Sequence, residues 1–260
     1  MTQSPHEVWK TLEDIRGLSA VPATWRAHLA GSFATFGAAF LQPETTTVLS
    51  VPCPRECGCW HYVIPQNGSF IGRCQCEPPN CADLQLTHTD VTALQLNRPK
   101  LARAIARAIG CETKTSTIPL PNTQQIGSWS AEAIPVILTI QANEYELRHV
   151  IAELGQRFQR PFILFSPTSD NIDAAGQELL AHTRAAFFGL DSTVRIMQNG
   201  DLQPIKPPTE LLARFLPESK RLRASEPPRY MIRKGLGFWR LIFDGQEAIL
   251  KHERGIYFVA

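Results

Sequence analysis

Six of the seven cysteines of this chain lie close together in the sequence, and their spacing predicts a metal site. They form two groups, the first of which is followed by a histidine: Cys53, Cys57, Cys59 and His61, then Cys74, Cys76 and Cys81. In a reducing compartment, clustered thiols bind metal ions as thiolates instead of pairing as disulfides. Zinc is the expected ion, because four sulfur ligands in a tetrahedron suit it and no redox motif accompanies the cysteines.

The residues between the two cysteine groups predict a β-hairpin. Asn67-Gly68 is the strongest turn signal for a two-residue hairpin loop, and strand-forming residues flank it on both sides. Such a hairpin brings the two cysteine groups together, and the arrangement resembles a zinc ribbon over residues 53–81. The Cys-x3-Cys spacing that begins at Cys53 and the Cys-x4-Cys spacing that begins at Cys76 depart from the Cys-x2-Cys spacing usual in zinc ribbons.

Two sets of ligands follow from this hairpin. The loop set lies in the turns: Cys53, Cys57, Cys76 and Cys81. The strand set shares one face of the hairpin when Asn67 and Gly68 are the central turn residues: Cys59, His61, Cys74 and Cys76. The loop set is preferred, because turns leave backbone amides free to hydrogen-bond the thiolates. Either set fills four coordination positions with protein atoms, so we expect one structural zinc ion per chain.

A second candidate site lies at Ser166-Pro-Thr-Ser-Asp170, which follows a predicted buried strand and opens a predicted helix. Strand ends of this kind bind ligands in open α/β sheets, and helix N-terminal amides attract anions. The ligand-binding candidates are therefore Ser166, Thr168, Ser169 and Asp170. Ser, Thr and Asp are also ordinary helix caps, and the sequence contains none of the common phosphate-loop, dinucleotide, nucleophile-elbow or zinc-protease motifs.

The C-terminal part of the chain is basic. Residues 206–260 contain 11 Lys and Arg against 6 Asp and Glu, while the rest of the chain contains 15 against 18. The predicted hairpin around Asp244-Gly245 and a predicted helix beginning near Lys251 resemble the opening of a winged-helix module. We therefore expect DNA contacts from Arg233, Lys234 and Arg240. The last residues, 254–260, are apolar and lack a helix C-cap, as in a chain cut inside an element.

The element pattern predicts an α/β or α+β protein in several parts. We expect a helical and zinc-hairpin module over 1–110, a linker over 111–133 and a small three-stranded parallel α/β module over 134–205. A basic, proline-containing linker over 206–228 then leads to a β-rich segment over 229–260. No stretch approaches the roughly 18 apolar residues of a membrane span, and no secretory signal opens the chain, so we expect a cytoplasmic protein without membrane contacts.

These features favour an intracellular regulatory or DNA-associated protein with a structural, non-catalytic zinc. An enzyme or small-ligand sensor acting near Ser166 is one alternative. A protein-interaction adaptor is the other. Salt-dependent DNA binding distinguishes the first interpretation, a bound metabolite the second and a co-purifying protein the third.

Overall fold

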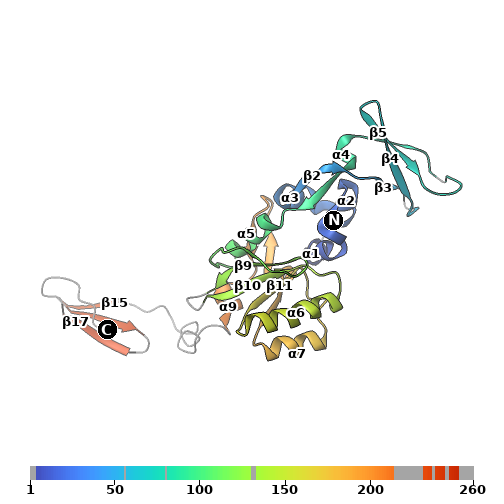
Figure 1. Ribbon diagram of the computed structural model, residues 1–260. Helices are drawn as coiled ribbons and strands as arrows, with labels where there is room; N and C mark the ends of the chain where they lie inside the picture. Colours follow the sequence, from blue (N-terminus) through green and yellow to red (C-terminus); the bar gives the residue numbers. More distant parts are fainter. Residues whose placement is uncertain are drawn as a thin grey trace. The chain divides into compact units, whose positions relative to one another are not determined.

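The computed structural model describes residues 4–55, 57–79, 81–129 and 133–213, together with strands between residues 231 and 251. Helices occur beside several separate sheets, so the protein has the predicted α+β character (Figure 1). The chain divides into two compact units, residues 1–205 and 206–260, which are described in turn. Within the described residues, no helix combines the length and apolarity that a membrane crossing requires.

The first unit opens with helices α1 (Pro5–Asp14), α2 (Pro22–Leu29) and α3 (Phe33–Phe40). Ser4 and Glu7 form a capping box at the start of α1, in which each side chain accepts a hydrogen bond from the other residue's backbone amide. The helices pack around four buried aromatic side chains: Trp9, Trp25, Phe36 and Phe40. This aromatic cluster holds α1 in place for the contacts described below.

A small antiparallel sheet with the strand order β1-β7-β2 accompanies these helices. Its strands are β1 (Ser19–Ala20), β2 (Leu41–Thr47) and β7 (Thr92–Leu96). The short helix α4 (His88–Val91) precedes β7, and α5 (Arg98–Ala108) follows it. This sheet joins the cysteine segment to the rest of the unit, because β2 leads into that segment and β7 follows it.

The cysteine segment itself folds as an antiparallel sheet, with the order β3 (Ser50–Pro52), β4 (Trp60–Gln66), β5 (Ser69–Cys74) and β6 (Leu84–Leu86). The predicted turn residues Asn67 and Gly68 join β4 to β5, and both have positive φ, as a type I′ turn requires.

The hydrophobic cluster packed against this β3–β6 sheet is small. Its buried members among the described residues are Val21, Val51 and Val91, and of these only Val51 belongs to the sheet. Partly buried side chains, including Val63 and Phe70, surround them. A sheet with so little apolar burial needs a further source of stability, such as a metal ion.

The larger sheet of the first unit has the order β12-β11-β10-β9-β8. Strands β10 (Ile134–Thr139), β11 (Ile163–Ser166) and β12 (Ala186–Gly189) are parallel, as predicted from their apolar sequences. Helices α6 (Glu144–Phe158) and α7 (Ala174–His182) connect them and lie together on one side of the sheet (Figure 1). The core between helices and sheet includes Ile137, Leu147, Val150, Ile151, Leu154, Phe162, Leu164 and Leu180.

The structure differs from the sequence prediction over residues 111–133, which was expected to be a linker. Strands β8 (Ser116–Thr117) and β9 (Thr123–Trp129) lie there and extend the sheet beyond β10 in antiparallel pairing. The hydroxyls of Thr123 and Thr139 are buried and hydrogen-bonded at 2.8 Å. Backbone pairing and buried hydrogen bonds of this kind allow a strand to form in a polar segment that shows no apolar pattern.

The first unit ends with helix α8 (Leu190–Thr193) and a hairpin of β13 (Val194–Ile196) and β14 (Leu202–Pro204) around Asn199-Gly200. The second unit contains α9 (Pro208–Leu211), after which residues 214–230 lie outside the described part.

The β-rich segment expected over 229–260 forms an antiparallel sheet with the order β15-β16-β17. Its strands are β15 (Met231–Gly235), β16 (Phe238–Phe243) and β17 (Gln246–Lys251). The helix predicted to begin near Lys251 falls on residues 252–260, which the structure does not describe. The resemblance to a winged helix therefore stays a prediction.

Candidate metal centre

The pairing of β3 with β4 brings together the cysteines of the first group. Val51 faces His61 in this register, and Pro52 faces Trp60. One position further along, the Cys53 amide donates a hydrogen bond to the Cys59 carbonyl at 2.9 Å. The short loop between these two cysteines carries Cys57, so three thiols gather at one end of the sheet.

The β4–β5 hairpin brings the second cysteine group to the same end. His61 pairs with Cys74, in the register predicted from the Asn67-Gly68 turn. Cys74 is the last residue of β5, and Cys81 lies in the connection that leads to β6. The two cysteine groups therefore meet although the chain between them runs out along β4 and back along β5.

Four sulfur atoms from the two groups form what we call the first tetrad: Cys53, Cys57, Cys59 and Cys81. Their Sγ atoms all lie within 4.8 Å of one another. Cys57 Sγ is 3.1 Å from Cys59 Sγ and 3.4 Å from Cys81 Sγ. Cys81 Sγ is 3.6 Å from Cys59 Sγ and 3.7 Å from Cys53 Sγ. Four sulfur ligands at about 2.3 Å from a tetrahedral metal ion would lie about 3.8 Å apart, so the spacing fits such an ion.

A second tetrad shares two of these residues and consists of Cys59, His61, Cys74 and Cys81, again with all ligand atoms within 4.8 Å. Cys74 Sγ is 3.9 Å from Cys59 Sγ. His61 is fully buried, and neither of its ring nitrogens has a hydrogen-bond partner among the described residues. Leaving a buried polar group unpaired costs free energy, and coordination of a metal ion through one nitrogen would offset that cost.

Each predicted ligand set contributes three residues to one tetrad, and Cys76 is the exception in both cases. In the first tetrad, Cys59 stands where the loop set has Cys76. In the second tetrad, Cys81 stands where the strand set has Cys76. The reason for the first difference is the pairing of β3 with β4, which places Cys59 beside Cys53 and which the sequence prediction did not include.

The remaining cysteines lie outside both tetrads. Cys76 is half-buried, and its hydrogen bond with the Cys74 thiol raises its pKa. Cys111 follows α5, and burial raises the pKa of its thiol to about 12, so it is protonated at neutral pH. Cys111 therefore provides a control for experiments on the tetrads.

Backbone amides support the thiols of the first tetrad. The Arg55 amide donates a hydrogen bond to Cys53 Sγ at 3.4 Å. The backbone amide of Cys59, together with neighbouring thiols, lowers the pKa of Cys57 to about 6. The hydrogen bond with Cys57 raises the pKa of Cys59 in turn, and a hydrogen bond with Cys57 likewise raises the pKa of Cys81 to about 11. The Cys57 thiol therefore favours the thiolate, which is the form that binds metal ions.

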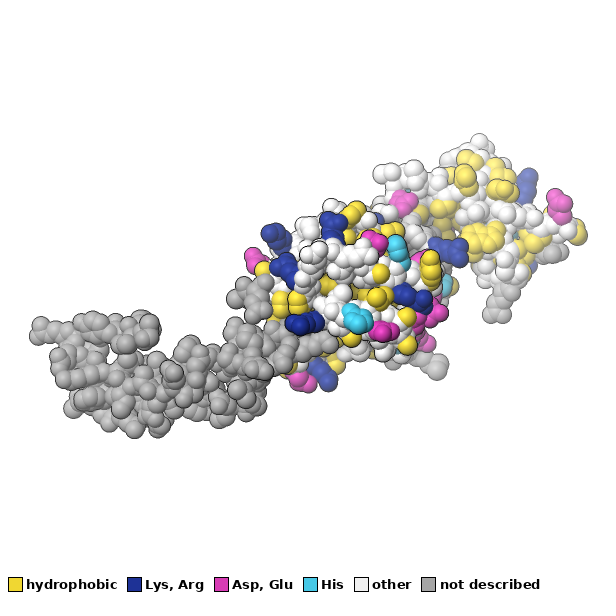
Figure 2. Space-filling view, turned by 60° about the horizontal axis from the view of Figure 1, so that its bottom comes forward, with side chains coloured by type: hydrophobic (Ala, Val, Ile, Leu, Met, Phe, Trp, Pro, Cys, Tyr) yellow, Lys and Arg dark blue, Asp and Glu magenta, His cyan; other side chains and the backbone are white. Residues whose placement is uncertain are grey.

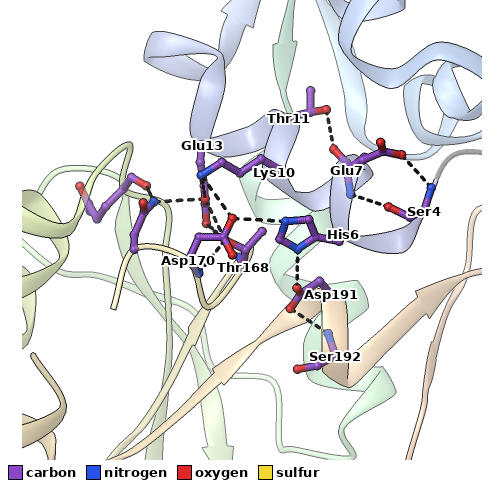
Figure 3. Close-up of polar contacts among 12 residues, drawn as sticks. Ser4, His6, Glu7, Lys10, Thr11, Glu13, Thr168, Asp170, Asp191 and Ser192 are labelled. Atoms are coloured by element: carbon purple, nitrogen blue, oxygen red, sulfur yellow. Dashed lines mark hydrogen bonds and ion pairs between the residues drawn. The ribbon is translucent and has the colours of Figure 1, made fainter. Parts of the chain in front are cut away.

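The structure fills the second predicted site, at the end of β11, with one of the protein's own carboxylates (Figure 3). Glu13 of α1 accepts hydrogen bonds of 2.9 Å from the Thr168 amide and from the Thr168 hydroxyl. Asn171 Nδ2 donates to Glu13 at 3.1 Å, and Lys10 Nζ lies 3.0 Å from it. The Glu13 side chain is fully buried, so the anion-binding capacity predicted for this turn is used within the chain.

The other predicted ligand residues near this turn have different surroundings. Ser166 is fully buried, and its hydroxyl has no hydrogen-bond partner among the described residues. Ser169 accepts a backbone hydrogen bond from Ile172. Asp170 faces His6, whose Nε2 is 3.2 Å from the Asp170 carboxylate and whose Nδ1 is 2.9 Å from that of Asp191 (Figure 3). The hydrogen bond with Asp191 raises the pKa of His6.

The predicted nucleic-acid residues lie in the second unit. Arg233 and Lys234 belong to β15, and Arg240 belongs to β16, where it pairs with Ile232. The structure describes only the backbone at these positions. The DNA contacts expected of them therefore stay a prediction.

The chain was also compared with known proteins. No protein-family model, curated protein or solved structure matches it.

Proposed function

We propose that the chain is a zinc-binding protein in which zinc is structural and holds together the cysteine loops of the β3–β6 sheet. The observation that carries this proposal is the first tetrad, whose four Sγ atoms all lie within 4.8 Å of one another, close enough to be ligands of one tetrahedral ion. Thiolate and imidazole ligands suit zinc, while magnesium and calcium prefer oxygen.

Two features support a structural role over a catalytic one. Each tetrad offers four protein ligands, so a tetrahedral ion would keep no open position for water or substrate. The β3–β6 sheet also has a small hydrophobic cluster, so the free energy of metal binding would contribute to its folding.

The purified chain should retain zinc after prolonged dialysis, and substitution of the residues that both tetrads share should abolish this retention. The test is to measure zinc by mass spectrometry in the wild type and in a Cys59→Ser, Cys81→Ser double variant. Cys111→Ser is the matched control, because it removes a thiol outside both tetrads and should keep the wild-type zinc content. A wild type without bound zinc, or a double variant with full zinc content, would contradict the proposal.

A DNA-associated regulatory role is the finer form of the proposal, and it rests on the basic composition of residues 206–260. If Arg233, Lys234 and Arg240 contact phosphates, affinity for duplex DNA should fall steeply with salt, with each contact adding about 0.9 to the log-log slope. The measurement is DNA binding of the full chain at two salt concentrations, with and without Arg233→Ala and Lys234→Ala. No binding at ~50 mM salt, or binding that the double variant leaves unchanged, would exclude this role.

An exposed hydrophobic stripe on β4 favours the protein-interaction alternative as a second candidate function. Trp60, Tyr62 and Ile64 are 50%, 59% and 39% exposed and alternate along the strand, so they share its outer face. The Tyr62 position pairs with Arg73, which is also exposed. Trp, Tyr and Arg are the residues enriched at protein interfaces. Figure 2 shows hydrophobic side chains at this end of the first unit, with charged side chains of both signs beside them.

A photo-reactive amino acid at Tyr62 should therefore crosslink a discrete protein partner in cells. The same amino acid at Tyr145, an isolated aromatic residue of α6 that is 74% exposed, is the matched control and should not. The crosslinked products are compared by gel electrophoresis and mass spectrometry. Identical crosslinking patterns from the two positions would count against an interaction role for the stripe.

A further inference from the structure

The two tetrads overlap at Cys59 and Cys81, and this overlap bears on how many ions the centre holds. One tetrahedral ion takes four ligands. An ion in the first tetrad alone would leave His61 and Cys74 without a metal, although both side chains are buried. An ion in the second tetrad alone would leave Cys53 and Cys57 unused, although each has its sulfur within 3.7 Å of another ligand sulfur.

We infer that the centre binds two zinc ions, with Cys59 and Cys81 as thiolates that bridge them. This inference rests on the proposed zinc-binding function and replaces the single ion expected from the sequence. One ion is held by the first tetrad and the other by the second. A thiolate sulfur has lone pairs enough to bond two metal ions, so both ions are four-coordinate and every member of the two tetrads is a ligand.

The position of the shared sulfurs agrees with a bridged pair of ions. Cys59 Sγ and Cys81 Sγ are 3.6 Å apart, so two zinc ions bonded to both at about 2.3 Å would lie about 3 Å from each other. The remaining ligands are divided between the two ions. Cys53 and Cys57 belong only to the first tetrad, and His61 and Cys74 belong only to the second.

The buried histidine is the observation that a single ion in the first tetrad cannot explain. His61 is fully buried and lacks a hydrogen-bond partner among the described residues at both Nδ1 and Nε2. Almost all buried polar side chains in proteins have a partner. A second ion gives His61 a partner. The same ion is also bound by Cys74, which pairs with His61 across the hairpin.

The first test is the zinc content of variants that remove the unshared ligands of one tetrad at a time. Wild type should contain two zinc ions per chain by elemental analysis and native mass spectrometry. The Cys53→Ser, Cys57→Ser variant and the His61→Ala, Cys74→Ser variant should each retain one. Cys111→Ser is the matched control: it removes a thiol that belongs to neither tetrad, and it should retain two.

The second test uses the wild-type chain, so it does not depend on how well a variant folds. After zinc is replaced by cadmium-113, the NMR spectrum should show two cadmium signals with scalar coupling between them, transmitted through the shared sulfurs.

The outcomes separate this inference from the proposed function. One zinc per wild-type chain, or two cadmium signals without coupling, would overturn the bridged centre while leaving a zinc-binding function in place. No zinc in the wild type would overturn both.

Discussion

Removal of zinc should unfold the β3–β6 sheet while the larger sheet with α6 and α7 stays folded. The reason is the difference between the two hydrophobic clusters: the first has three buried side chains among the described residues, and the second has ten. Structural zinc contributes on the order of 10–16 kcal/mol in small zinc modules, which exceeds what the small cluster can supply. This is the largest effect expected for any single change to the protein.

Hydrogen exchange followed by mass spectrometry checks this expectation segment by segment. Peptides from residues 50–86 should lose protection after chelation, while peptides from β10, β11 and α6 should keep it. The Cys59→Ser, Cys81→Ser variant should already lack protection over residues 50–86 and should not respond to the chelator. Unchanged protection of β4 and β5 in the metal-free protein would contradict a structural role for the metal.

Replacement of Glu13, the buried carboxylate of α1 that contacts the turn after β11, should produce the second-largest effect. Glu13→Ala leaves the Thr168 amide and hydroxyl, the Asn171 amide and the Lys10 ammonium without their shared acceptor. Removing one partner of a buried ionic group costs about 3–5 kcal/mol, so the midpoint of chemical denaturation should fall substantially.

Two further variants separate the buried contacts from general effects on α1. Glu7→Ala removes a carboxylate of the same helix that only completes the capping box, and its cost should be about 1 kcal/mol. Glu13→Gln retains an acceptor oxygen but loses the charge opposite Lys10, so its cost should lie between the other two. A Glu13→Ala midpoint no lower than that of Glu7→Ala would show that the buried contacts contribute little.

The sequence was most informative where local chemistry determines the structure. Asn67-Gly68 predicts the turn, and the turn fixes which residues of β4 and β5 face each other, including His61 and Cys74. Asn143 is likewise of a residue type that caps helices, and its side chain accepts a hydrogen bond from the Glu146 amide at the start of α6. In both cases the interacting groups lie within a few residues of each other or on either side of one turn.

Long-range contacts were not predictable in the same way. Glu13 and Thr168 are 155 residues apart, and nothing in the sequence near either one indicates the other. The pairing of β3 with β4 is local, since only the short Cys53–Cys59 loop separates the two strands, and a hairpin interpretation of that loop places Cys59 beside Cys53. The strand β9 had no such signal, because its sequence is largely polar; it pairs with β10 through the backbone, and the Thr123 hydroxyl hydrogen-bonds that of Thr139.

The central claim is that the cysteines and histidine of the β3–β6 sheet form a zinc–thiolate centre, and X-ray absorption at the zinc edge of the purified protein tests it most directly. We predict a first shell dominated by sulfur at about 2.3 Å with a minor nitrogen contribution at about 2.0–2.1 Å from His61. A first shell of oxygen and nitrogen alone, without sulfur, would contradict the claim.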